Sequence, residues 1–413
     1  MSKVRVRFAP SPTGVPHLGS LRTALFNFLF AKNQNGEFIL RIEDTDQKRL
    51  VPGAVEKIKE SLELLGLKWD EYYVQSDRLN LYQKYLEELK KKKLVYEDEG
   101  AWRFKVEKGP HLEWQDVVHG PVKFSSDVIE DFIIIKSDGF PTYHFASVID
   151  DHGLNITHVF RGDEWLSSTP KHLLLYRALD WQPTIFIHLP PILGSDHKKL
   201  SKRTGAKSVM EYLSEGYLPE AIINFLAFLG WAPKEDRELF SLEELTKEFT
   251  LDRINKNSPI FNSEKLNWFN KKYLQKIADQ DLAKKIKTFS KNASSIDDQL
   301  LSKIVVLVKD RMSTLVDFDR YASVFFTKGN EAPPEKSKTK NAKTAIEKID
   351  NWTAEKIATT LDNWILSNNL DSGDFKNTLR LSVFADNTPP IYQSLAVLSK
   401  EEVLKRIDDA LNH

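Results

Sequence analysis

The stretch VRVRFAPSPTGVPHLG, residues 4–19, joins an alternating segment to a proline-rich loop and the beginning of a helix. Apolar residues alternate with arginines over 4–8, which is the pattern of a strand with one buried face. Residues 9–14 contain Pro and Gly and cannot continue that strand. From Leu18 onward, apolar residues recur at helical spacing until Asn35-Gly36. This order predicts the first strand–helix unit of an α/β sheet.

The alternation of strand and helix patterns continues along the chain. Residues 37–43 have the pattern of a second strand, and apolar residues recur at helical spacing over 55–65. Further strand and helix patterns follow at 156–160, 170–179 and 184–188. This order predicts a Rossmann-type, doubly wound parallel sheet. Residues from about 96 to 135 have the pattern of short strands with turns, which predicts an inserted α+β domain, and the chain after Gly205 has helical patterns only.

Composition restricts the class of protein. A chain of 413 residues is long enough for more than one domain, and 41% hydrophobic with 29% charged residues is globular composition. The formal net charge of +0 gives no overall sign of a nucleic-acid partner. Cysteine is absent, which excludes disulfides and thiolate metal sites. The chain has no signal-peptide pattern and no run of ~20 apolar residues, so we expect a soluble cytoplasmic protein without a membrane partner.

Two short motifs bear directly on chemistry. Pro16-His17-Leu18-Gly19 lies where the first strand gives way to a helix, and Lys199-Leu200-Ser201-Lys202-Arg203 is a basic loop beyond the last predicted strand. A helix N-terminus offers N–H donors to phosphate, and mobile lysines stabilise a departing pyrophosphate. Together the two motifs predict a site that uses ATP to form an adenylate.

Both motifs stand among others that occur in the same order in a known family. The further motifs are Arg7-Phe8-Ala9-Pro10-Ser11-Pro12-Thr13-Gly14, Arg22-Thr23-Ala24-Leu25-Phe26-Asn27, Arg41-Ile42-Glu43-Asp44-Thr45-Asp46, Pro141-Thr142-Tyr143-His144-Phe145-Ala146, Asp150-Asp151-His152 and the run from Ile156 to Trp165. As far as about Tyr273, the chain closely resembles the bacterial-type glutamyl-tRNA synthetases, which are class I aminoacyl-tRNA synthetases. It departs from them in two places. The short segment 97–101 stands where the family often has a longer insert, and 384–388 lacks the usual glycine-rich stretch.

The resemblance implies a division of the chain into five segments. They are the first half of the Rossmann catalytic domain (1–95), an inserted connective domain that holds the tRNA acceptor end (96–140), the second half of the catalytic domain (141–235), a stem-contact region (236–275) and an all-α anticodon-binding region (276–413).

The resemblance also assigns the two short motifs to ATP. His17 would donate hydrogen bonds to the phosphates at the positive end of the first helix, and Gly19 would let adenosine pack on the helix backbone. Lys202 would stabilise pyrophosphate as it leaves, so His17 and Lys202 are the predicted catalytic residues. The predicted ATP-binding residues are His17, Gly19, Lys199, Leu200, Ser201, Lys202 and Arg203. Mg²⁺ is expected to bind through ATP oxygens and water, and we expect no protein metal site and no zinc.

Glutamate has two carboxylates and one ammonium, so its pocket requires cations and an anion. Arg7 and Arg161 lie at strand ends on the expected ligand edge of the sheet, where a guanidinium suits a carboxylate. Glu43, at the end of the second strand, suits the ammonium. By resemblance, the glutamate-binding residues are Arg7, Ala9, Ser11, Glu43, Tyr143, Ser147 and Arg161.

These assignments predict a monomeric glutamate–tRNA ligase that charges the 3′-terminal ribose of tRNA(Glu). A short relative attaches glutamate to the modified base queuosine, but it lacks a tail such as the one that follows Tyr273 here. Glutaminyl-tRNA synthetase has a tail of two β-barrels, whereas this tail has helical patterns. A catalytically inactive tRNA-binding protein would not require a complete site for ATP and an amino acid. The sequence is compatible with charging of tRNA(Glu) alone or of tRNA(Gln) as well.

Overall fold

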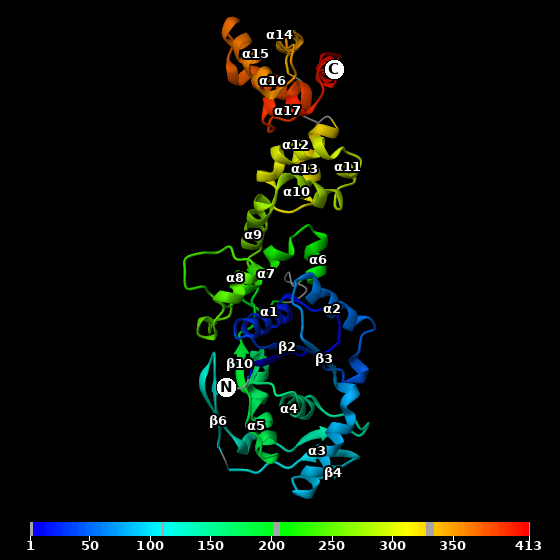
Figure 1. Ribbon diagram of the computed structural model, residues 1–413, viewed down its shortest axis with the longest axis vertical. Helices are drawn as coiled ribbons and strands as arrows, with labels where there is room; N and C mark the ends of the chain where they lie inside the picture. Colours follow the sequence, from blue (N-terminus) through cyan, green and yellow to red (C-terminus); the bar gives the residue numbers. More distant parts are fainter. Residues whose placement is uncertain (1–2, 110, 201–206, 328–333, 413) are drawn as a thin grey trace. The chain divides into compact units, whose positions relative to one another are not determined.

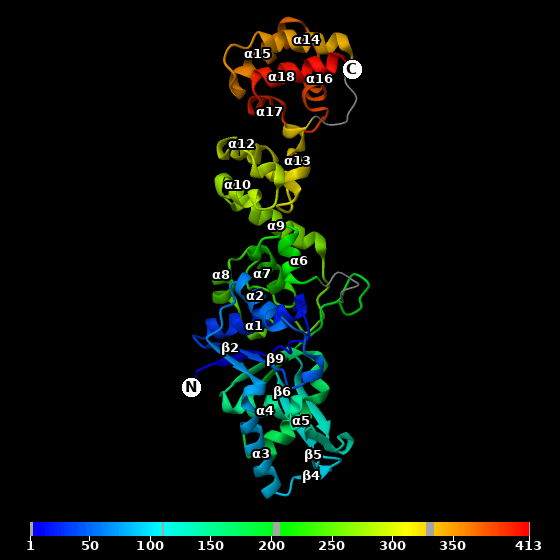
Figure 2. The same ribbon diagram turned by 90° about the vertical axis from the view of Figure 1, so that its right-hand side faces the viewer.

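The computed structural model describes residues 3–109, 111–200, 207–327 and 334–412. The chain divides into two compact units, each of which takes in two stretches of sequence (Figures 1 and 2). The first unit consists of residues 1–214 and 219–269, and the second consists of 215–218 and 270–413.

The first unit contains two sheets. The strands of the larger sheet are β1 (Arg5–Phe8), β2 (Glu37–Ile42), β3 (Glu71–Val74), β6 (His111–Asp116), β7 (Gly120–Ser125), β9 (His158–Gly162) and β10 (Ile185–Leu189). Their order is β3-β2-β1-β9-β10-β6-β7, and all neighbours are parallel except β6 and β7. The smaller antiparallel sheet has the order β4 (Val95–Asp98), β5 (Ala101–Phe104) and β8 (Phe132–Ile135).

Helices cover both faces of the larger sheet. The helices of the first unit are α1 (Leu18–Asn33), α2 (Ala54–Leu64), α3 (Leu79–Lys91), α4 (Tyr143–Gly153), α5 (Thr169–Ala178), α6 (Val209–Ser214), α7 (Pro219–Phe228), α8 (Leu242–Glu248) and α9 (Ser263–Lys276), whose last residues belong to the second unit. Figures 1 and 2 show α1 on one side of the sheet and α4 with α5 on the other. Helix α1 is buried around most of its circumference because the sheet lies on one side of it and α7 and α8 on the other.

The strand order reverses between β1 and β9, which pair in parallel at Val6 and His158. The chain leaves these two neighbouring strands in opposite directions across the sheet, which opens a crevice beyond their carboxyl ends. Phe8 ends β1 and Gly162 ends β9, so the residues around them border this crevice. The predicted Rossmann-type fold is therefore confirmed, and its topology indicates where a ligand would bind.

The region 96–140 does not form one separate sheet. Strands β4, β5 and β8 do form the small antiparallel sheet, but the β6–β7 hairpin pairs with β10 through Phe186 and Asp116 and extends the larger sheet. The hairpin thereby covers an edge of β10 that would otherwise present unpaired backbone groups. The alternating patterns predicted short strands here, but they did not indicate this long-range partner.

The second unit is helical throughout its described residues, as predicted. Its helices, besides the end of α9, are α10 (Asp279–Lys287), α11 (Lys291–Ser294), α12 (Asp298–Val308), α13 (Asp317–Phe326), α14 (Lys336–Glu347), α15 (Ala354–Ser367), α16 (Ser372–Phe384), α17 (Ile391–Val397) and α18 (Lys400–Asn412). The segment 215–218 joins this unit because Leu315 N donates to Gly216 O at 3.0 Å and Leu218 N donates to Asn270 Oδ1 at 2.7 Å. A Cβ at Gly216 would lie 2.7 Å from Leu315 N, so this close approach requires glycine.

Short 3₁₀ turns connect several of these elements. They lie at Gln47–Arg49, Gln75–Arg78, Ser126–Val128, Asp163–Ser168, Leu251–Arg253 and Lys309–Arg311. None of the helices described is both long enough and apolar enough to cross a membrane.

Candidate active site

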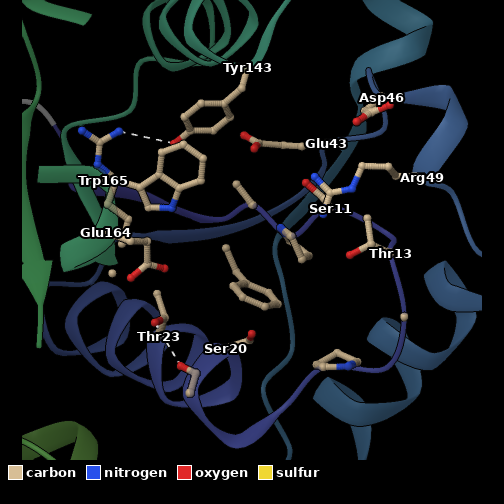
Figure 3. Close-up of a pocket in the computed structure, with 18 of the residues that line it drawn as sticks. Ser11, Thr13, Ser20, Thr23, Glu43, Asp46, Arg49, Tyr143, Glu164 and Trp165 are labelled. Carbon is tan, nitrogen blue, oxygen red and sulfur yellow. Dashed lines mark hydrogen bonds between the residues drawn. The ribbon is translucent and has the colours of Figure 1, made fainter. Parts of the chain in front are cut away.

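A pocket of about 950 Å³ lies at the carboxyl ends of β1 and β9, where the strand order reverses (Figure 3). Its lining includes most of the predicted site residues, namely Arg7, Ala9, Ser11, His17, Gly19, Glu43, Tyr143, Arg161, Lys199 and Leu200. Ser147 does not line it; this residue is fully buried in α4, and its hydroxyl lies 3.4 Å from Arg41 Nη2. Ser201, Lys202 and Arg203 lie outside the described residues.

Buried charges of both signs form one end of the pocket. Arg7 Nε donates to Asp151 Oδ1 at 3.1 Å, and Arg41 Nη1 donates to the same oxygen at 2.7 Å. Arg41 Nη2 also donates to Glu43 Oε1 at 2.8 Å. Arg7 and Glu43 reach the pocket, whereas Arg41 is completely buried behind them. The network therefore fixes a guanidinium and a carboxylate side by side at the ligand edge.

Sequence reasoning assigned no role to Arg41 or Asp151, although both stand within the motifs that carry the resemblance. The period of a strand gives a signal for Arg41, because residues two apart share a face, and Arg41 therefore lies on the same side as Glu43, the residue that follows β2. No comparable signal marks Asp151, since its contacts with β1 and β2 depend on how α4 packs against the sheet.

The two carboxylates of this network differ in their electrostatic surroundings. Burial raises the pKa of Glu43, and the nearby Arg41 and Arg7 offset only part of that effect. Burial also disfavours the charge of Asp151, but the guanidiniums of Arg7 and Arg41 together hold its pKa below the ordinary value. Asp151 is thus an anion satisfied within the protein, whereas Glu43 would gain from a further cation in the pocket.

Tyr143 and Trp165 form an aromatic wall beside Arg161. The ring centroids of Tyr143 and Trp165 are 4.2 Å apart, and Arg161 Nη1 donates to the Tyr143 hydroxyl at 3.3 Å. Figure 3 shows Tyr143 on the same side of the pocket as Glu43 and next to Trp165. An amino acid bound between Glu43 and Arg161 would therefore lie against an aromatic surface while its charged ends meet charges of opposite sign.

The other end of the pocket is the N-terminus of α1. His17 is the N-cap residue, and its Nδ1 accepts a hydrogen bond from Ser20 N at 3.2 Å. In a neutral imidazole this leaves Nε2, which lies 3.4 Å from Ser20 Oγ, as the protonated nitrogen and hence a donor. A Cβ at Gly19 would lie 3.0 Å from Cε1 of the His17 ring, so glycine leaves room for this ring as well as for a ligand. The arrangement suits a phosphate group.

The chain on both sides of residues 201–206 lies near this helix end. Leu200 N donates to Ile192 O at 2.8 Å, and Lys199 and Leu200 line the pocket. On the other side, Ser208 forms a β-bridge with His17. Lys199 Nζ is 3.8 Å from a carboxylate oxygen of Glu164, which also lines the pocket. The two predicted motifs are therefore brought together at one edge of the sheet, as far as the described residues extend.

Comparisons with known proteins agree with this geometry. The catalytic-domain model of the class I tRNA synthetases (E and Q) matches residues 3–102 and 90–268, and an anticodon-binding-domain model matches 272–411. The glutamate–tRNA ligase of Dehalococcoides mccartyi is 38% identical, with 99% of this chain and 97% of the relative covered. Glutamate–tRNA ligase 1 of Fervidobacterium nodosum is also 38% identical, with 100% of both chains covered.

Solved structures give the same result. The crystal structure of a glutamate tRNA ligase from Elizabethkingia meningosepticum, in complex with its amino acid, is similar with a TM-score of 0.92 and 33% identity, covering 100% of this chain and 99% of that one. The glutamate-tRNA synthetase of Elizabethkingia anophelis matches equally well, with a TM-score of 0.92 and 33% identity over 100% of both chains. From its catalytic-domain match and its full-length relatives, this chain belongs to the class I tRNA synthetases of the E and Q type, named by the one-letter symbols of glutamate and glutamine.

Proposed function

We propose that this chain is a glutamate–tRNA ligase. It would activate glutamate with ATP to glutamyl-adenylate and transfer glutamate to the 3′-terminal ribose of tRNA(Glu), with release of pyrophosphate and AMP. The observation that carries this proposal is a single pocket that joins Arg7, Glu43 and Arg161 at one end to the N-terminus of α1 at the other. Its full-length relatives named glutamate–tRNA ligase support the same reaction.

The charges at one end of the pocket match those of glutamate. Arg7 and Arg161 supply guanidiniums for carboxylates, and Glu43 supplies the anion for the ammonium. An arriving ammonium would also offset the burial that raises the pKa of Glu43. Ala9, Ser11 and Tyr143 complete the proposed glutamate pocket, and Ser147 would act from behind it through Arg41.

The other end of the pocket suits the phosphates of ATP. His17 Nε2 and the N–H groups of the first turn of α1 would bind phosphate oxygens, and Lys199 and Lys202 would offset the charge that develops on pyrophosphate. The carboxylate of glutamate attacks the α-phosphorus, so the work of these residues is to position the reactants and stabilise charge. Mg²⁺, which this reaction would use, would bind chiefly through ATP oxygens and water.

The second unit supplies a basis for choosing the tRNA. Its match to an anticodon-binding domain over 272–411 supports a role in reading the anticodon, while the inserted region from 96 to 140 would hold the acceptor end.

We propose that the protein acts as a monomer in the cytoplasm.

Aminoacylation of separated tRNAs with labelled glutamate tests the proposal. The purified chain with ATP and Mg²⁺ should charge tRNA(Glu), and tRNA(Glu) without its 3′-terminal adenosine should accept no label. Charging of tRNA(Gln) in the same assay would show a broader tRNA specificity. Labelling of the shortened tRNA, or transfer of glutamine in place of glutamate, would refute the proposed reaction.

A further inference from the structure

A chain of buried polar side chains lies behind the guanidinium of Arg161 on three neighbouring strands. Arg161, on β9, donates from Nε to His188 Nε2, on β10, at 3.0 Å. His188 Nδ1 lies 2.5 Å from Oδ2 of Asp116, the last residue of β6. His188 and Asp116 are 0% exposed and Arg161 is 5% exposed. Placing two charged groups and an imidazole in the interior is costly, and these three satisfy one another.

The direction of each hydrogen bond in this chain follows from the chemistry of Arg161. An arginine Nε–H can only donate, so His188 Nε2 must accept and the imidazole proton must be on Nδ1. That proton is then donated to the Asp116 carboxylate. Burial lowers the pKa of His188, and the hydrogen bond with Asp116 offsets this only in part, so the ring is neutral at ordinary pH.

Asp116 is itself held in place by the turn that follows it. Its Oδ1 accepts hydrogen bonds from Val118 N and His119 N, both at 3.0 Å. The carboxylate therefore has one oxygen on the turn of the β6–β7 hairpin and the other on His188. Rotation of the Asp116 carboxylate would break both sets of contacts. The backbone N–H groups of the hairpin turn therefore hold the carboxylate, and the carboxylate in turn holds the His188 ring.

The contacts of Arg161 leave one part of its guanidinium for a ligand. Within the described chain, three of its five N–H groups meet acceptors: Nε–H meets His188, one on Nη1 meets the Tyr143 hydroxyl at 3.3 Å, and one on Nη2 meets Thr169 Oγ1 at 2.7 Å. One N–H group therefore remains on each terminal nitrogen, and Arg161 lines the pocket. Two such donors can bind a carboxylate with both of its oxygens, provided that the guanidinium plane has the correct orientation.

We propose that His188 and Asp116 are positioning residues for glutamate. They set the plane of the Arg161 guanidinium through its Nε–H, and the two remaining N–H groups then face the bound carboxylate. This inference rests on the proposed function, because it assigns these residues to the binding of that reaction's amino acid. Neither residue lines the pocket. His188 Nε2 also lies 3.2 Å from Thr169 Oγ1, which accepts from Arg161 Nη2, so both contacts of the ring act through Arg161.

The substitution Asp116→Asn tests the proposal by reversing one hydrogen bond while keeping the shape of the side chain. The amide oxygen would remain on the two turn N–H groups, so the NH₂ group would face His188 Nδ1. His188 would then carry its proton on Nε2, opposite the Arg161 Nε–H. We expect the KM for glutamate to rise about 10- to 100-fold, as small misplacements of binding groups typically produce, with the KM for ATP changed by less than about twofold.

A double-mutant cycle separates positioning from a general structural effect. In an Arg161→Ala background, Asp116→Asn should raise the KM for glutamate no further, because the residue through which it acts is gone. Glu113→Gln is the matched control, since it also converts a carboxylate on β6 into an amide, but Glu113 is exposed and pairs with Lys123 at 2.9 Å. This control should leave the KM for glutamate unchanged.

A pair of substitutions at His188 gives a second test if Asp116→Asn does not fold. His188→Gln retains an acceptor for the Arg161 Nε–H and His188→Leu does not, so the KM for glutamate should be higher in the leucine variant by roughly tenfold. Equal KM values in folded forms of this pair, or an equal rise with and without Arg161 in the cycle, would overturn the proposal.

Direct measurement of glutamate binding separates an error in the positioning role from an error in the proposed reaction. If the unsubstituted chain binds glutamate by calorimetry in the presence of tRNA but does not charge tRNA(Glu), the proposed reaction is wrong. The positioning role is then judged from the glutamate affinity of the same variants. If the unsubstituted chain does not bind glutamate under these conditions, both proposals are wrong.

Discussion

The two units of this chain differ in where they place charge. Among the described residues, the first unit buries the charged side chains Arg7, Arg22, Arg41, Glu43, Asp44, Asp116, Asp150, Asp151 and Arg161, whereas the second buries only Arg406. Burying charge is costly unless it is paired, and replacing a buried ion pair by apolar residues often costs nothing. In the first unit, Arg7, Arg22, Glu43 and Arg161 line the pocket. Arg41 and Asp151 contact residues of that set, so much of this buried charge is concentrated at one site.

Arg406 shows that a buried charge alone does not mark a site. Its guanidinium donates to Val324 O at 2.8 Å and to Phe325 O at 3.2 Å, near the C-terminus of α13, and to Glu402 at 2.8 Å. Carbonyls at a helix C-terminus carry partial negative charge and commonly interact with cations. Arg41 differs because both of its partners are buried: Glu43 lines the pocket, and Asp151 also pairs with the pocket residue Arg7.

The largest expected effect tests this contrast between the two arginines. Arg41→Met should lower the free energy of unfolding of the first unit by about 3–5 kcal/mol, because it leaves buried carboxylates without a counter-charge. Arg406→Met should cost about 1–3 kcal/mol, since it strands carbonyl groups but its carboxylate partner Glu402 is 38% exposed. Urea unfolding of both variants measures the difference, and an equal loss would remove the distinction drawn here.

Lys202→Ala should lower the rate of glutamate activation by roughly 10²–10³, with little change in the stability of either unit, because a cation that acts on developing charge is lost. Lys202 lies outside the described residues, and this expectation follows from its place in the Lys199–Arg203 motif. The control is Lys338→Ala in the second unit, an exposed lysine paired with Asp374. Pyrophosphate exchange in the presence of tRNA measures both. A near-normal rate in a folded Lys202→Ala protein would contradict the role.

Arg161→Ala should raise the KM for glutamate by about 10²-fold, because charge-assisted hydrogen bonds to the carboxylate are removed. The KM for ATP should change much less. Arg311→Ala is the matched control, since Arg311 lies in a 3₁₀ turn of the second unit, where it contacts Thr388 and Tyr321. If Arg161→Ala affected ATP use and spared glutamate use, the two ends of the pocket would have been assigned in the wrong order.

The fourth expected effect is absent at neutral pH and concerns acid stability. Burial lowers the pKa of His144 and of His158, each to about 4, so these rings stay neutral in the folded state while they would bind protons when unfolded. The first unit should therefore lose stability as pH falls from about 6.5 towards 4, by up to about 1.4 kcal/mol per pH unit for each histidine. Protonation of Glu43, whose pKa is raised by burial, offsets part of this loss.

The second unit should respond at lower pH. Its histidine, His413, lies outside the described residues, and its carboxylates include Asp298, whose pKa is lowered by a hydrogen bond with Lys287. A carboxylate of this kind loses its contribution only as pH falls below the ordinary aspartate range. Hydrogen exchange of peptides from each unit at pH 7 and pH 5, corrected for intrinsic rates, measures both responses. An equal loss of protection in the two units at pH 5 would contradict the prediction.

Local patterns in the sequence were sufficient for the elements that carry the motifs. The alternation over 4–8 and the apolar spacing from Leu18 correspond to β1 and α1, because period and capping are properties of neighbouring residues. The pairing of β6 with β10 could not be predicted in this way, since Phe186 and Asp116 are brought together by the fold and not by proximity in the chain.

The same distinction applies to the candidate site. The residues that line the pocket stand in motifs that the resemblance could identify, such as Arg7, His17 and Glu43. The residues that support them stand behind the pocket, and sequence reasoning gave no role to Arg41, Asp116 or His188. Ser147 belongs with this supporting group, because it is buried and does not reach the pocket. Position relative to the ligand depends on packing, which a motif does not encode.

The contact between Gly216 and Leu315 has a consequence for how this protein is made. Residues 215–218 leave the ribosome long before their partners, because Leu315 follows them by roughly 100 residues, or about 5 to 20 s at ordinary rates of synthesis. Asn270, which accepts from Leu218 N, is synthesised about halfway through that interval, but the contact of Gly216 must wait for Leu315. The second unit is therefore complete only when it contacts residues 215–218, which are synthesised between the two stretches of the first unit.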